Sequence, residues 1–319
     1  MKTTKTREFE HLPFNAFWEK GYKDNTVSTM GGPNHDIVEL AAALPPGTRV
    51  LDLGCGEGRN AFFLAGRGCQ VTAVDRSEAG IEKLSALARR TGVPLRAVVA
   101  DIAELELRDT WDVIMAHGVI DYLDNATWRR LLTRLKEHTS PGGYNAYTCM
   151  LFTDTYPAGP EFLAAGFKHS LAQGELAGFY GDWELVRHDR YVKWDQHPGI
   201  PLHCHPVDKL VARKPGGGGP SPRREPVPAG EVDLPRPLFD AIDMGTPAEE
   251  VLARCGEPAV VDTFTMEGVQ LGVGPTDSLT VDGYRLSLWY YGRAVLYVIN
   301  GRVWGRALYD SRPVRMTFR

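Results

Sequence analysis

Hydrophobic positions in the first two thirds of the chain follow two different periods. Short runs rich in β-branched and aliphatic residues are typical of strands that are buried on both faces. These runs are TRVLDL (48–53), CQVTAVD (69–75), PLRAVVA (94–100), WDVIMAH (111–117) and GYNAYTCMLF (143–152). The segments between them place apolar residues three and four positions apart, which predicts amphipathic helices.

Two of these helices have recognisable ends. Ser77 is the predicted N-cap of the first, Asn125 opens the second, and SPGG (140–143) is expected to stop the second. The predicted buried faces are Ile81, Leu84, Leu87 and Ala88 in the first helix and Trp128, Leu131, Leu132 and Leu135 in the second.

Strand and helix in alternation predict an α/β fold with a doubly wound, mostly parallel sheet. After a last helix at 171–180, the runs WELVRHDRYVK (183–193) and DKLVARK (208–214) are close enough to add an antiparallel edge. The sequence therefore predicts seven strands in the sheet.

The composition and the hydrophobic pattern of the chain change after residue 214. Proline and glycine make up 12 of the 23 residues at 215–237, which predicts a linker. Beyond it, 244–258 reads as a capped amphipathic helix and 285–308 as three strands joined by a glycine turn and an Asn-Gly turn. We therefore expect a domain at 1–214 and a small α+β module at 238–319, through which a protein partner or a second copy would bind.

Composition narrows the kinds of ligand. A formal net charge of −4 with 24% charged residues gives no basic excess of the kind that nucleic-acid binding needs. No apolar run is long enough for a signal peptide or a membrane span, so we expect a cytoplasmic protein. The five cysteines follow no repeating interval, which is typical of reduced thiols. A small-molecule substrate fits this composition best.

A glycine-rich turn follows the first predicted strand. Gly54, Gly56 and Gly58 let the backbone turn sharply, and the helix after them can present free N–H groups to a ligand. Asp75 ends the next strand, where it can accept both hydroxyls of a ribose. A dinucleotide-binding fingerprint would need a third glycine where Arg59 stands. Because that glycine is absent, an NAD-type oxidoreductase is only the second interpretation of this chain. A non-catalytic protein that senses a cofactor or a metal is the third.

The stretches VLDLGCGEGRNAFFLA (50–65), ADI (100–102) and TSPGGYNAY (139–147), together with Asp75, resemble class I S-adenosylmethionine-dependent methyltransferases over residues 12–214. GCGEGRN, EHTSPGGYN, GELAGFYGDWELV and LVARKP are similar to the tellurite-resistance methyltransferases within that class. The resemblance implies a Rossmann-like sheet, S-adenosylmethionine as cofactor, and methyl transfer to a small soft nucleophile, either a metalloid oxyanion of the tellurite or selenite type or a thiol.

The resemblance also implies cofactor-binding residues. They are Asp52, Gly54, Cys55, Gly56 and Asn60 at the methionine end, Asp75 and Arg76 at the ribose, Asp101 and Ile102 at the adenine, and His117 on the floor. Trp18 and Tyr22 are expected either to cover the cofactor or to anchor an N-terminal helix.

The sequence indicates the site of the methyl acceptor less clearly than the cofactor site, because no residue stands out as a catalytic base. Asp121 and Tyr122 follow the fourth strand and are expected to cap the next helix. In LHCH (202–205), an extended backbone places His203 and His205 on one side and Cys204 on the other. The two imidazoles could contact an anionic substrate or bind a metal. Alternatively, the segment is only a polar hairpin loop before the last strand. We predict the substrate contact and expect no metal.

Overall fold

The structure is a computed structural model that describes residues 16–23, 32–159, 162–163, 166–168, 171–197, 200–217, 222–228, 234–266, 271–272, 280–281 and 284–318. Its helices are α1 (Ala16–Lys23), α2 (His35–Leu40), η2 (Ala41–Ala43), α3 (Arg59–Gly66), α4 (Glu78–Thr91), η3 (Ile120–Tyr122), α5 (Asn125–Glu137), α7 (Glu175–Phe179), α8 (Arg236–Asp240) and α9 (Ala248–Cys255). None of the helices in these ranges is long and apolar enough to cross a membrane.

The strands are β1 (Arg49–Leu53), β2 (Gln70–Asp75), β3 (Arg96–Val99), β4 (Trp111–His117), β5 (Thr139–Met150), β6 (Glu184–His197), β7 (Ile200–Arg213), β8 (Arg223–Pro226), β9 (Val260–Met266), β10 (Leu271–Gly272), β11 (Thr280–Val281), β12 (Tyr284–Tyr291), β13 (Ala294–Ile299), β14 (Arg302–Tyr309) and β15 (Val314–Thr317). The first seven lie in the order β3-β2-β1-β4-β5-β7-β6. The pairs from β3 to β5 are parallel and β7 is antiparallel to both neighbours, which confirms the predicted doubly wound sheet.

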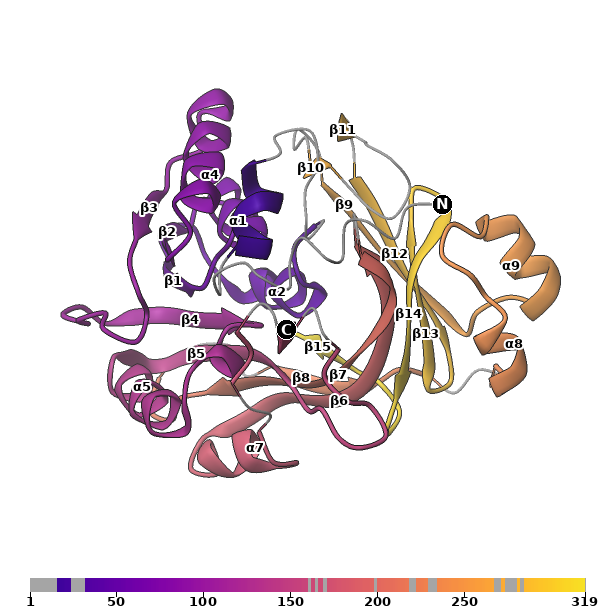
Figure 1. The fold of residues 1–319 in the computed structure, drawn as a ribbon. Helices are drawn as coiled ribbons and strands as arrows, with labels where there is room; N and C mark the ends of the chain where they lie inside the picture. The colour runs from indigo at the N-terminus through magenta and orange to yellow at the C-terminus, as the bar shows by residue number, and fades with distance from the viewer. Residues whose placement is uncertain are drawn as a thin grey trace.

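Helices cover both faces of this sheet (Figure 1). Apolar side chains of α2, α3 and α4 pack on one face, and those of α5 and α7 pack on the other. Ser77 caps α4 as predicted, because its hydroxyl accepts a hydrogen bond from Gly80 N. Asp124, the residue before the predicted Asn125, is the N-cap of α5. The SPGG segment is part of β5 and not a turn after the helix.

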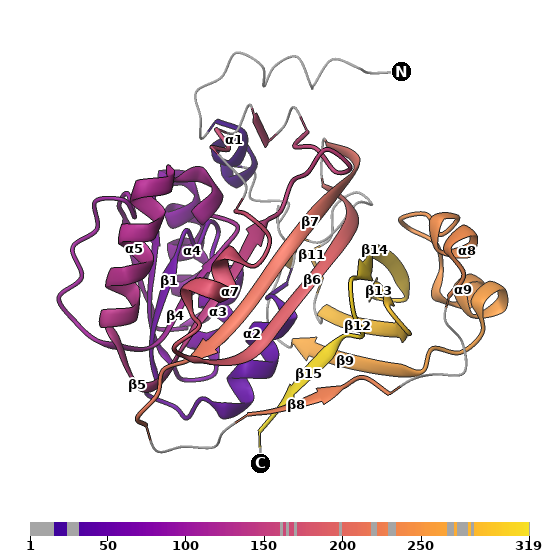
Figure 2. The same cartoon turned by 90° about the horizontal axis from the view of Figure 1, so that it is seen from below.

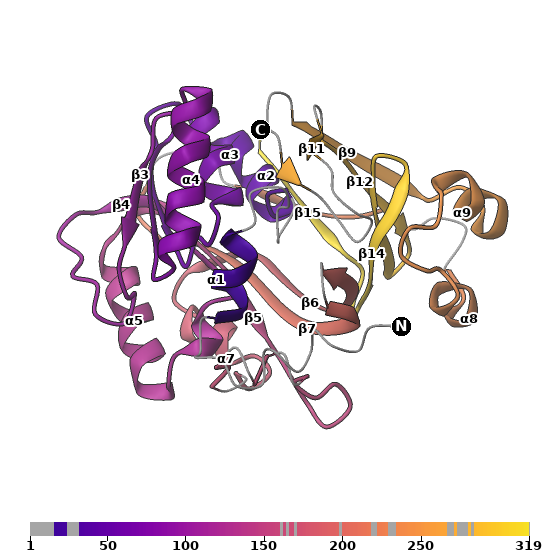
Figure 3. The same ribbon diagram turned by 45° about the horizontal axis from the view of Figure 1, so that its top comes forward.

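The C-terminal strands continue the same sheet (Figures 2 and 3). Strand β6 pairs with β7 on one side and with β14 on the other, and the order continues β14-β13-β12-β9 to give eleven strands. We expected a linker and a separate module here, and the structure differs. The 215–237 segment contains β8, which pairs with β15, and the first residues of α8. The physical reason is that the backbone N–H and C=O groups along the free edge of β6 would otherwise be unpaired, and β14 pairs with them.

Packing also joins the two parts of the sheet. A single hydrophobic cluster includes Ile37 and Val50 from the N-terminal part and Leu288, Tyr290 and Tyr309 from the C-terminal part. Helices α8 and α9 cover the outer face of β12 and β13, where their side chains form a cluster of their own (Figure 3). The Asn300-Gly301 turn between β13 and β14 has positive φ at both residues, as the predicted Asn-Gly hairpin requires.

Candidate active site

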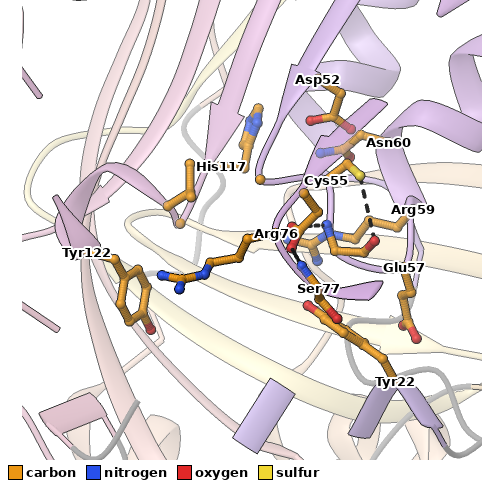
Figure 4. Close-up of a pocket in the computed structure, with 15 residues that line it drawn as sticks. Tyr22, Asp52, Cys55, Glu57, Arg59, Asn60, Arg76, Ser77, His117 and Tyr122 are labelled. Atoms are coloured by element: carbon orange, nitrogen blue, oxygen red, sulfur yellow. Dashed lines mark hydrogen bonds between the residues drawn. The ribbon is translucent and has the colours of Figure 1, made fainter. Parts of the chain in front are cut away.

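A pocket of about 130 Å³ lies at the carboxyl ends of β1, β2 and β4 (Figure 4). This is the edge of an open α/β sheet at which ligands bind. The pocket is lined by Tyr22, Asp52, Gly54, Cys55, Gly56, Glu57, Arg59, Asn60, Asp75, Arg76, Ser77, His117, Gly118, Val119 and Tyr122.

The glycine turn forms one wall of the pocket and has no room for larger residues. Gly54 and Gly56 have φ values of +67° and +57°, in the left-handed region that favours glycine. A Cβ on Gly54 would lie 2.5 Å from a methyl group of Val119, and one on Gly56 would lie 2.5 Å from the Tyr22 hydroxyl. The turn therefore requires glycine at these two positions.

Asp75 fixes the conformation of that turn. Its Oδ2 accepts a hydrogen bond from Gly56 N at 2.7 Å, and its Oδ1 accepts one from Ser77 N at 2.8 Å. Burial raises the pKa of Asp75, and the hydrogen bonds from Ser77 and Gly56 oppose this effect. The carboxylate thus connects the glycine turn to the start of α4.

Asp52 is a buried carboxyl group in the pocket wall with spare hydrogen-bonding capacity. The residue is 2% exposed, and its Oδ2 has no hydrogen-bond partner among the described residues. Burial and, next, the charge of Asp75 raise the pKa of Asp52 to about 8, although Arg59 lowers it. A cationic ligand group beside this carboxyl would favour its ionised form.

His117 lines the pocket and belongs to a buried chain of polar groups. Its Nε2 lies 3.0 Å from Asp36 Oδ2, and the other oxygen of Asp36 lies 2.6 Å from Lys209 Nζ. Although burial alone would raise the pKa of Asp36, Lys209 and His117 hold it well below its usual range. Burial, opposed by Asp36, lowers the pKa of His117.

Helix α1 closes one side of the pocket. Glu19 accepts hydrogen bonds from the Ser77 hydroxyl and from Ala79 N, at the N-terminus of α4. Tyr22 is 7% exposed and lines the pocket next to Gly56. The Trp18 side chain lies outside what the structure describes, so the prediction for it stays a prediction.

Most of the sequence-predicted cofactor residues lie in the pocket wall: Asp52, Gly54, Cys55, Gly56, Asn60, Asp75, Arg76 and His117. Asp101 and Ile102 are not among the lining residues. Asp101 is exposed and accepts a hydrogen bond from Ala103 N at 2.9 Å, and Ile102 is buried in the core on the α5 side of the sheet.

Sequence reasoning missed Asp36 and Lys209. They are 173 residues apart in the chain, so no local motif connects them. The only signal available was that each is followed directly by apolar residues, Asp36 by Ile37 and Lys209 by Leu210. Asp121 was also misjudged, because it caps no helix. It is fully buried, both its oxygens lie within 3.2 Å of Met150 N, and burial raises its pKa to about 8.

His203 and His205 lie on the same face of β7, with ring centroids 4.5 Å apart. The LHCH segment is therefore a strand and not the hairpin loop that we considered. Phe162 contacts both rings, and Lys193 on β6 is paired directly with His205. Neither histidine is among the residues that line the pocket. No group of three or more metal-ligating side chains occurs in the described part of the chain.

The two histidines nevertheless lie on the side of the sheet that carries Asp36 and His117. Lys209, whose ammonium group contacts Asp36, is four residues further along the same face of β7 than His205. At about 3.3 Å per residue the two positions are roughly 13 Å apart along the strand.

Comparisons with known proteins identify similar sequences and folds. A family model described as tellurite resistance protein TehB matches residues 15–195, more than half of the chain. Hemagglutinin 1 of Eikenella corrodens is 33% identical over 185 residues, covering 57% of this chain and 60% of that protein. A probable S-adenosyl-L-methionine-dependent methyltransferase TehB of Haemophilus influenzae is 30% identical over 167 residues, covering 52% of this chain and 55% of its own length.

Among solved structures, that of TehB from Haemophilus influenzae superposes with a TM-score of 0.52 and 28% identity, covering 57% of this chain and 62% of that chain. The chain thus spans less than two thirds of the length of each of these relatives.

Proposed function

We propose, since this chain belongs to the tellurite resistance protein TehB family, that it is an S-adenosylmethionine-dependent methyltransferase acting on a small soft nucleophile. The acceptor is a metalloid oxyanion of the tellurite or selenite type, or a thiol. The observation that carries this proposal is the pocket at the carboxyl ends of β1, β2 and β4, with its glycine turn, the buried Asp52 and the half-buried Asp75.

The residues of the pocket fit this cofactor. The Oδ2 of Asp52 has no hydrogen-bond partner among the described residues and is suited to the ammonium group at the methionine end. Gly54 and Gly56 keep the turn in this conformation, because a Cβ at either position would meet Val119 or Tyr22. We assign the Asp75 carboxylate, which accepts hydrogen bonds from Gly56 N and Ser77 N, to the ribose hydroxyls, because a carboxylate can accept about four hydrogen bonds. We assign Arg76, which lines the pocket, to the ribose end. Asp101 and Ile102 follow β3 outside the pocket lining, and their assignment to the adenine end rests on the sequence resemblance alone.

The cofactor supplies a methyl group on a sulfonium, which is electrophilic without a metal or a redox step. What remains for the protein is to bind, to align the acceptor and to exclude water. Helix α1 contributes to the exclusion of water, because Tyr22 is buried over the glycine turn and Glu19 holds the helix against α4.

His203 and His205 are the proposed acceptor contacts. Their rings share one face of β7 with Lys209, and Lys193 lies directly across from His205 on β6. Imidazole and ammonium groups donate hydrogen bonds to oxyanions and carboxylates. An acceptor with a negatively charged group is therefore favoured over an uncharged one.

The test is a search for methylated products with the full chain and S-adenosylmethionine carrying a labelled methyl group. Selenite, tellurite, arsenite and small thiols are supplied singly, and products are detected by mass spectrometry. We expect labelled product from at least one of them. The His203→Ala/His205→Ala double variant should reduce turnover at least tenfold while leaving the affinity for S-adenosylhomocysteine within about threefold.

Cys204→Ala is the matched control, because Cys204 lies on the same strand with its side chain on the opposite face. It should keep wild-type turnover. Absence of labelled product from every acceptor would contradict the proposed function, and a fully active double variant would remove the two histidines from the acceptor site.

A further inference from the structure

His117 is placed as an oriented imidazole at the end of β4. Its side chain is 4% exposed and lines the pocket (Figure 4). One ring nitrogen, Nε2, faces Asp36 at 3.0 Å. The other, Nδ1, is buried without a hydrogen-bond partner among the described residues. A buried ring nitrogen without a partner is costly, and such a group is expected to have a role in the site that it lines.

The partner on Nε2 decides which nitrogen carries the proton. Asp36 is fully buried and forms an ion pair with Lys209, whose side chain is 3% exposed. An ionised carboxylate only accepts hydrogen bonds, so Nε2 must donate. The neutral imidazole therefore has its proton on Nε2 and its lone pair on Nδ1. This is the orienting role that a buried aspartate has toward the histidine of a hydrolase triad.

The charges around the ring keep it neutral. Burial disfavours the imidazolium, Asp36 on α2 favours it, and Lys209 on β7 and Arg59 on α3 oppose it. Together they lower the pKa of His117 from its ordinary value, so the Nδ1 lone pair is available at neutral pH. A neutral and oriented imidazole is the form that accepts a proton.

We propose that His117 is the catalytic base of this chain, that Asp36 and Lys209 are its positioning residues, and that the acceptor is a thiol. This inference rests on the proposed function and narrows its acceptor class. The thiol proton passes to Nδ1 as the thiol sulfur forms a bond to the methyl carbon. The bond between that carbon and the sulfonium sulfur breaks, the electron pair stays on that sulfur, and the products are a methyl thioether, a neutral thioether and imidazolium.

A thiol fits this arrangement better than a metalloid oxyanion. The nucleophilic atom of selenite or tellurite already has a free lone pair and no proton to lose, so a base would add nothing to its attack. A thiol has an ordinary pKa of about 8.5 and is mostly protonated at pH 7. A thiol acceptor therefore benefits from a base beside the reacting sulfur, and the pocket wall supplies one.

The first test compares two probes in three variants of the full chain. Mercaptoacetate, a thiol that carries a carboxylate, and selenite are the acceptors. His117→Gln removes the base, and Asp36→Asn/Lys209→Gln removes the orienting carboxylate without leaving a buried charge unpaired. His138→Gln is the matched control, because His138 is a half-buried histidine outside the pocket lining whose Nδ1 contacts Asp109 O. S-Adenosylhomocysteine affinity is measured for each by calorimetry.

The second test is independent of turnover. Nitrogen-15 NMR of the imidazoles, with the His117 signals identified by their loss in His117→Gln, reports the tautomer directly. We expect Nε2–H at pH 7 with a titration midpoint below 6.5, and a shift toward Nδ1–H in Asp36→Asn/Lys209→Gln, because an asparagine amide can donate to Nε2.

The expected kinetic result is a loss of about 100-fold or more in methylation of mercaptoacetate by His117→Gln, with a loss at least tenfold smaller for selenite. Equal losses on the two probes, a wild-type protein that methylates only selenite, or an Nδ1–H or charged imidazole at pH 7 would overturn the inference. A wild-type protein that does not bind S-adenosylhomocysteine, or that gives no labelled product from selenite, tellurite, arsenite or any of the thiols, would instead overturn the proposed function.

Discussion

Tyr191 and Tyr309 stack across the junction between β6 and β14, with ring centroids 4.6 Å apart and ring planes 22° from parallel. Both residues are buried, at 6% and 3% exposure. One belongs to the sheet that carries the pocket and the other to the C-terminal strands. The stacked pair, the β6–β14 hydrogen bonds and the shared hydrophobic cluster make the C-terminal strands part of the same folding unit as the pocket.

Tyr309→Ala should therefore destabilise the whole chain. Removing a buried aromatic ring from a packed core costs about 3–5 kcal/mol, and the loss should be shared by both parts of the sheet. Urea unfolding followed by circular dichroism should show one transition at a lower midpoint than in the wild type. Val261→Ala, at a half-exposed position on β9, is the control and should cost less than about 1 kcal/mol. Two separate transitions, with only one of them shifted, would show that the C-terminal strands fold independently.

Gly56→Ala should abolish cofactor binding through its position in the glycine turn. The new Cβ would lie 2.5 Å from the Tyr22 hydroxyl, in addition to the strain of a positive φ. Gly92→Ala is a matched control, because Gly92 has φ of +71° at the end of α4 with nothing within 4 Å of the new Cβ. Both changes should lower stability by about 1–2 kcal/mol. Calorimetry should show loss of S-adenosylhomocysteine binding in the first variant only, and equal affinity in both would contradict this account of the turn.

Binding of S-adenosylhomocysteine at pH 7 should release close to one proton from Asp52. The pKa of Asp52 is raised to about 8 by burial and by Asp75, so the carboxyl group is mostly protonated before the ligand arrives. An ammonium group beside it favours the ionised form. Affinity should rise up to tenfold per pH unit from pH 6 and level off near pH 8. Calorimetry in two buffers of different ionisation enthalpy measures the released protons, and the proton release should disappear in Asp52→Asn. A wild-type protein that releases no proton would contradict the assignment.

Asp121 should make the stability of the protein fall as pH rises. Burial raises its pKa to about 8 in the folded state, whereas an unfolded aspartate has a pKa of about 4. Between these values the unfolded state loses the proton and the folded state keeps it, so raising pH favours unfolding. The slope from this residue is up to about 1.4 kcal/mol per pH unit.

Asp121→Asn tests this dependence, because the amide oxygen can still accept the hydrogen bond from Met150 N. The free energy of unfolding, measured by urea titration from pH 5 to pH 8, should fall less steeply with pH in the variant than in the wild type. Parallel pH profiles for the two proteins would show that Asp121 is ionised in the fold.

The parts of the fold that local sequence determines were predictable. The glycine turn, the strand ends at Leu53 and Asp75 and the N-cap at Ser77 follow from the residue types over short windows, and the structure places them as expected. The alternation of strands and helices likewise sufficed to predict a doubly wound sheet whose first seven strands are mostly parallel with an antiparallel edge.

What could not be predicted depends on contacts between distant segments. Nothing in the sequence near Tyr309 indicates that β14 pairs with β6, since the proline- and glycine-rich segment between them reads as a linker. The orientation of His117 depends on Asp36 and Lys209, which come from α2 and β7. Periodicity shows which residues face the same side of one element, but not which elements face each other.

Calorimetric titration of the full chain with S-adenosylhomocysteine and, separately, with NAD tests the central claim most directly. The account predicts that S-adenosylhomocysteine binds at one site per chain, and that NAD does not bind at the same concentrations, because Arg59 stands where a dinucleotide fingerprint needs glycine. Binding of NAD without binding of S-adenosylhomocysteine would contradict it.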